Sequence, residues 1–167
     1  MHFVLSIVVF AVACYCFYAA FRGKTGSGKI PQKQLSGPNV TPFPRAVGAA
    51  ALAVDDPVTG AAIMMAAIAN LREPLDAATR TVIKDELREA TGADPEAAME
   101  YAAWAVAQAP DPDNISMRLA AMWKKNLNEA ERGQLADMVF RVASMRGEPT
   151  PQQADAIELL RSRLEID

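Results

Sequence analysis

The sequence predicts an all-α protein: one N-terminal transmembrane helix, a basic linker and a compact bundle of six to seven helices. Three observations predict this. Residues 1–21 carry no charged side chain, residues 22–45 carry only basic ones, and residues 46–167 hold repeated helix-start signals without the apolar–polar alternation of a half-buried strand. A chain of 167 residues suits one compact domain with an anchor and is too short for a large multidomain enzyme. We therefore expect an anchor (1–22), a linker (23–45) and a helical domain (46–167).

The first element is an uncharged run of 19 residues from Phe3 to Phe21. A helix of this length covers roughly 28 Å, close to the ~30 Å hydrocarbon core of a bilayer. Aromatic side chains gather toward its C-terminal end, where rings favour the headgroup level. The side chains expected to contact the membrane are Phe3, Val4, Leu5, Ile7, Val8, Val9, Phe10, Phe17, Tyr18 and Phe21.

Two cleaved leaders are the alternatives to an anchor. A signal peptide carries positive charge before its apolar run, where this chain has only His2 and the α-amine. A lipoprotein would be cut before Cys14, but Ala11 stands at the position where leucine is usual, and the apolar run continues past the cysteine. These departures favour an uncleaved anchor.

The linker predicts the orientation of the anchor. Its four basic residues and Arg22 just before it, with no acid among residues 22–45, place positive charge at the C-terminal end of the span, which should therefore stay cytoplasmic. The expected location is the inner (plasma) membrane, single-pass, with the N-terminus outside and the helical domain at the cytoplasmic face. Basic side chains this close to the bilayer are expected to lie at the lipid headgroups. They are Arg22, Lys24, Lys29 and Lys33.

Residues 23–29 match most of a Walker A phosphate loop, but their surroundings do not support nucleotide binding. That loop needs a preceding strand and a following helix, so that backbone amides hold the phosphates. Here an apolar span precedes it, Ile30 replaces the Ser or Thr that would bind magnesium, and Pro31 blocks the start of a helix. We expect a flexible spacer and no nucleotide.

Helix-start signals divide the remaining residues. A residue that can cap a helix precedes proline at 56–57, 94–95, 111–112 and 150–151, and 128–131 and 150–153 resemble capping boxes. Gly92 and Gly147 fall where helices should stop. The predicted helices are 45–54, 57–71, 76–91, 95–108, 112–126, 128–145 and 151–165.

Apolar spacing within these helices predicts the core. The helix at 57–71 is apolar nearly all round, which indicates the centre of the bundle. Trp104 and Trp123 are expected to be the largest core side chains, and the small residues at 60–62 should allow close helix approach. The other predicted core stripes are Val82, Ile83 and Leu87, then Leu135, Met138, Val139 and Val142, then Ile157, Leu160 and Leu164.

Part of the domain repeats. Residues 71–76 recur 75 residues later as 146–151, each time between an apolar helix and an amphipathic one. Two helix–loop–helix units related by a pseudo-twofold axis would explain this repeat.

Residues 55–164 resemble the TerB-like family, named for tellurite resistance and found also beside the J-domain in DjlA-type co-chaperones. The similarity lies in 55–69, 127–132 and 142–150. In that family each apolar helix runs into an Ala-Asp-Gly loop, whose acids bind metal in some members. Here Asn70-Leu71-Arg72 and Met145-Arg146-Gly147 stand at those loops, so a cation would meet repulsion from arginine. The resemblance therefore implies the fold and no metal site, with weak metal candidates at Glu73, Asp76 and Glu148.

Composition argues against catalysis. One histidine and two cysteines cannot build a zinc cluster, a disulfide framework or, in the helical domain, a His-centred triad. That domain has 12 basic and 20 acidic residues, which disfavours nucleic acid. Asp85, Glu86, Glu96 and Glu100 are expected to be solvated.

We therefore expect neither an enzyme nor a cofactor. The expected function is a membrane-anchored interaction module, an accessory subunit or adaptor of a membrane protein complex at the cytoplasmic face. The alternative is a TerB-like metal- or stress-responsive sensor, of the tellurite-resistance or co-chaperone-like kind.

Overall fold

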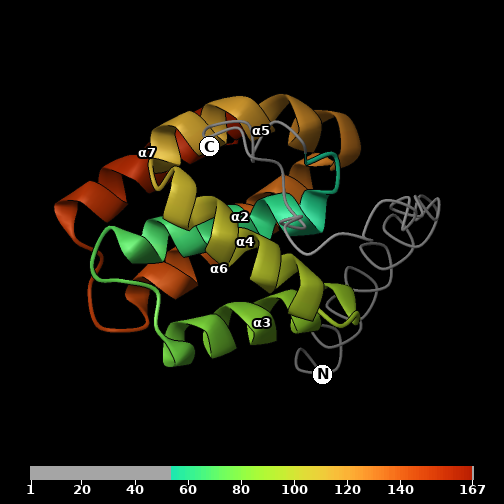
Figure 1. The fold of residues 1–167 in the computed structure, drawn as a ribbon. Helices are drawn as coiled ribbons and strands as arrows, with labels where there is room; N and C mark the ends of the chain where they lie inside the picture. The colour runs from blue at the N-terminus through green and yellow to red at the C-terminus, as the bar shows by residue number, and fades with distance from the viewer. Residues whose placement is uncertain (1–53, 167) are drawn as a thin grey trace, which may run out of the picture.

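The computed structural model describes residues 54–166, which form a compact bundle of six α-helices (Figure 1). Both ends of each helix fall within one residue of the predicted ends. The predicted anchor, the linker and the predicted helix at 45–54 lie outside the described residues. The helices are α2 (Pro57–Asn70), α3 (Ala77–Thr91), α4 (Glu96–Gln108), α5 (Pro112–Asn126), α6 (Glu129–Ser144) and α7 (Pro151–Leu164).

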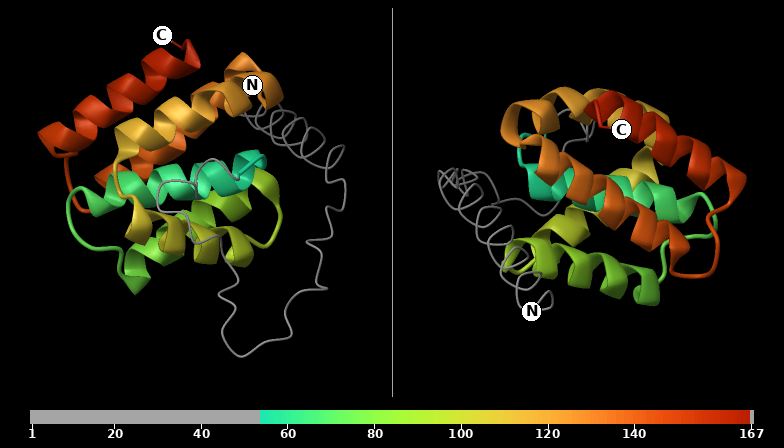
Figure 2. Two further views of the ribbon diagram at one scale, coloured as in Figure 1. Left: turned by 45° about the horizontal axis from the view of Figure 1, so that its top comes forward. Right: turned by 180° about the vertical axis from the view of Figure 1, so that it is seen from behind.

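Helix α2 forms the centre of the bundle, as its apolar sequence predicts. All ten residues from Gly60 to Ala69 are buried. The other five helices all pack against α2, and neighbouring pairs follow the order α4, α3, α6, α7, α5 around it (Figures 1 and 2). The predicted stripes of α3, α6 and α7 face this core, with only Val82 partly exposed.

Local capping explains most helix starts. Asp56 accepts hydrogen bonds from the amides of Val58 and Thr59 at 3.4 and 2.9 Å. The two predicted capping boxes are present, at Asn128 and Thr150. These bonds satisfy backbone N–H groups that have no partner within the first turn of a helix.

One predicted cap is shifted. The N-cap of α4 is Pro95 rather than Asp94, although an Asp94 carboxylate oxygen still accepts from the Glu96 amide at 3.1 Å. The left-handed Gly92 (φ 67°) ends α3 as expected, because glycine adopts this conformation without strain.

The two tryptophans differ in burial. Trp123 is fully buried, and its ring lies against Gly60, where an added Cβ would come within 3.3 Å of two ring atoms. The small residue therefore does allow close approach of α2 and α5. Trp104 packs against the core from α4, beside Tyr101 at 5.4 Å between ring centroids, but it is only partly buried, so it is not among the largest buried side chains as predicted.

No helix among residues 54–166 is both long enough and apolar enough to cross a bilayer. The predicted membrane and headgroup residues precede this part of the chain.

Candidate functional site

The three weak metal candidates lie in two loops that contact each other. The α2–α3 loop (71–76) and the α6–α7 loop (145–150) are each six residues long. Aligned on the helix ends, the loops correspond at a separation of 74 residues, not 75, so Arg72 corresponds to Arg146. We call these two loops the loop pair.

The helices beside the loop pair pack as two related units would. Helix α2 packs on α7 as α6 packs on α3, and α2 and α6 contact each other directly. These pairings are the ones expected if the two helix–loop–helix units, α2–α3 and α6–α7, pack on each other in a similar way.

Each arginine of the loop pair reaches the opposite loop. Arg72 donates from Nη1 to the Arg146 carbonyl oxygen at 2.8 Å, and from Nη2 to the Glu148 carbonyl oxygen. Arg146 forms ion pairs with Glu73, at 2.9 Å from Nη1 to Oε2, and with Asp76, at 2.5 Å from Nη2 to Oδ2. Two guanidinium groups therefore join the loops in both directions.

Asp76 also begins α3. Its Oδ1 accepts from the Thr79 amide at 2.8 Å, which is an N-cap bond. Hydrogen bonds from Thr79 and from Arg146 lower the pKa of Asp76 from 3.8 to about 2. The same contact with Asp76 raises the pKa of Arg146. At neutral pH Asp76 is a carboxylate whose two oxygens both have partners.

A buried glutamine lies beneath the loop pair. Gln153 of α7 accepts from the Thr150 amide at 3.0 Å and donates from Nε2 to the Ile68 carbonyl oxygen of α2 at 3.0 Å. The corresponding residue of the first unit, Thr79, is also buried. Both help to line a depression of about 220 Å³ that is partly open to solvent. The side-chain amide of Gln153 therefore caps its own helix, α7, and also satisfies a backbone carbonyl at the C-terminal end of α2.

The geometry of the loop pair does not suit a cation. Arg146 already neutralises Glu73 and Asp76, and its positive charge would repel a metal ion placed between them. Glu148 contributes its backbone carbonyl to Arg72. Within residues 54–166 no three His, Cys, Asp or Glu side chains are grouped so as to hold a metal ion.

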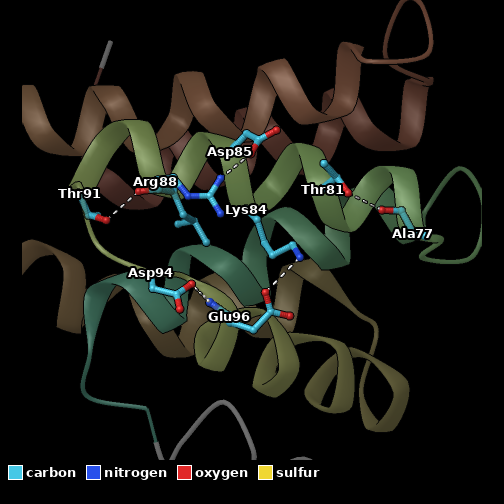
Figure 3. A network of polar contacts seen from close by, with 9 residues as sticks. Ala77, Thr81, Lys84, Asp85, Arg88, Thr91, Asp94 and Glu96 are labelled. Atoms are coloured by element: carbon cyan, nitrogen blue, oxygen red, sulfur yellow. Dashed lines mark hydrogen bonds and ion pairs between the residues drawn. The ribbon is translucent and has the colours of Figure 1, made fainter.

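Most of the other singled-out carboxylates are exposed, as expected. Asp85 pairs with Arg88 at 2.7 Å and Glu96 with Lys84 at 3.1 Å (Figure 3). Glu86 is the exception: its side chain is 15% exposed and holds Arg141 of α6 through both carboxylate oxygens. The expectation that Glu86 is solvated was wrong, because α6 packs across this face of α3.

A second depression lies at the opposite end of α2, roughly 21 Å along a helix of 14 residues. It spans about 260 Å³ between α2, α3 and α6, a volume that includes open solvent, and its lining is almost wholly apolar. We call it the α2 groove. Its lining residues include Pro57, Val58, Ala61, Leu87, Ala90 and Met138.

Sequence reasoning missed two roles. It treated Arg72 and Arg146 as groups that repel a metal, and it assigned Gln153 only to a capping box. A signal for the arginines was present, because each lies two residues after the end of an apolar helix. Nothing in the sequence pairs Gln153 with Ile68, 85 residues away.

Comparison of the chain with protein-family models, with curated proteins and with solved structures gives no match. The predicted membrane side chains and headgroup lysines lie outside the described residues, as does the Walker-like loop.

Proposed function

We propose that this protein is a membrane-anchored helical interaction module, an accessory subunit or adaptor that holds a partner in a membrane protein complex at the cytoplasmic face. The observation that carries the proposal is the order of charge along the chain. A 19-residue uncharged run is followed by a linker whose charged side chains are all basic, and a helical domain with net negative charge comes after both. This order is typical of a single-pass anchor with a cytoplasmic domain.

The chemistry of the described bundle supports binding rather than turnover. Most of the acidic groups singled out above form ion pairs with basic side chains, and Asp76 also caps a helix and stays ionised far below neutral pH. A general acid or base works best with a pKa near the operating pH. The ionisable groups of the loop pair are therefore suited to hold the bundle together.

We also propose that the helical domain has the architecture of TerB-like domains. The six-helix bundle and its repeated helix–loop–helix unit support it at the level of architecture. At the loops the chain has Arg146 between two carboxylates, where that family has acidic residues. We propose that the fold is shared and that arginine replaces the metal-binding chemistry.

Membrane fractionation tests the anchor. The full chain is expected in the membrane pellet after alkaline carbonate washing and in the soluble fraction only after detergent. Replacing Val8 and Val9 with arginine should release it, whereas the same change at Val40, in the linker, should not. Wild-type protein in the carbonate supernatant would contradict the proposal.

Affinity purification after mild detergent extraction tests the adaptor. We expect one or more membrane proteins to co-purify at fixed stoichiometry, and chemical cross-links to join them to the helical domain. A monodisperse monomer under extraction conditions that keep known membrane complexes intact would contradict an adaptor while leaving the anchor standing.

The competing function, a metal-responsive sensor, has its own test. Calorimetric titration with Ca²⁺ or Zn²⁺ should give no binding heat at millimolar metal, because a cation would have to displace Arg146. Binding that disappears in the Glu73→Gln, Asp76→Asn double variant would favour the sensor instead.

A further inference from the structure

We draw no further inference here: the strongest candidate, the α2 groove at the first turn of the central helix, has an enclosed volume of only about 10 Å³, and nothing in the structure shows what covers its apolar rim.

Discussion

Gly60 shows how one missing side chain sets the distance between two helices. An added Cβ there would lie 2.9 Å from the Met122 methyl and 3.2 and 3.3 Å from two atoms of the Trp123 ring. The methionine can move, but the ring is fully buried and donates from Nε1 to the Pro57 carbonyl oxygen at 3.4 Å. Substitution must therefore displace α5 or the indole.

We predict that Gly60→Ala lowers the free energy of unfolding by about 1–3 kcal/mol, the usual effect of overpacking a core. The matched control is Gly133→Ala in α6, where a Cβ meets nothing within 4 Å. Alanine there should stabilise the protein by ~0.5–1 kcal/mol, because it restricts the unfolded chain and favours the helix. Urea unfolding of both variants measures this, and a shift of the same sign in both would refute the packing argument.

Gln153 gives a second test of a single buried group. Its side chain both accepts from Thr150 and donates to the Ile68 carbonyl oxygen, and it is 1% exposed. A glutamate carboxylate keeps the first bond and loses the second, and it places an unpaired charge in the core. We predict that Gln153→Glu lowers the free energy of unfolding by at least ~1–3 kcal/mol at pH 7.

This loss should depend on pH. Burial raises the folded-state pKa of the introduced carboxyl above its unfolded value, so its neutral form is the more stable one in the fold. The destabilisation is therefore largest above the folded pKa and shrinks as the pH falls toward the unfolded value. Gln152→Glu, on the exposed neighbour, should have little effect at any pH, and equal behaviour of the two variants would remove the assigned role of Gln153.

At the scale of elements, the loop pair joins the two helix–loop–helix units through charge. Arg146 bridges Glu73 and Asp76 of one loop, and Arg72 binds two carbonyls of the other. Glu86 and Arg141 join α3 to α6 by a further ion pair. These contacts connect segments that are far apart in the chain.

We predict an acid-dependent contribution from Asp76. Its pKa of about 2 is below the ordinary 3.8, so the stability it contributes is present above about pH 4 and is lost as the pH falls through about 2. Asp76→Asn keeps an N-cap side chain and removes the charge. The gap in urea midpoint between wild type and variant should be constant from pH 5 to 7 and close toward pH 2.

Arg146→Met supplies the control for this titration. Part of the lowered pKa comes from hydrogen bonds with Thr79, which this change leaves in place. The gap caused by Asp76→Asn should therefore become smaller in the Arg146→Met background and not vanish. An unchanged gap would show that Arg146 has no part in the effect.

At the scale of the whole molecule, the arrangement of charge predicts topology. We expect that replacing Arg22, Lys24, Lys29 and Lys33 with glutamine, which leaves Arg45 as the only basic linker residue, places part or all of the helical domain on the outer face. The orientation is measured with an Ala97→Cys reporter in chains whose Cys14 and Cys16 are replaced by serine. Intact spheroplasts are treated with an impermeant maleimide, which labels the reporter only if the helical domain lies outside.

The matched control for topology removes positive charge from the helical domain instead of the linker. Changing Arg80 and Lys125 to glutamine removes two positive charges from the bundle, far along the chain from the predicted span. This variant should keep its reporter protected. Labelling of the wild-type reporter in intact spheroplasts would contradict a cytoplasmic domain.

The six helices of the described part and the central place of α2 could be predicted from the order of residues alone. Helix starts depend on residues within four positions of one another, such as Asp56 with Thr59 or Thr150 with Gln153, and such pairs can be read along the chain. The burial of α2 follows from a segment with no polar face.

The packed bundle was needed to show which side chains lie under a neighbouring helix and which groups meet across loops. Glu86 is covered by α6, Trp104 lies at the edge of the core, and Arg146 meets Asp76 from 70 residues away. Such contacts depend on how helices rotate and approach in packing, and at Gly60 the approach depends on one absent carbon atom. Local sequence fixes the period of a helix, but the identity of the neighbour on each face is a property of the assembled bundle.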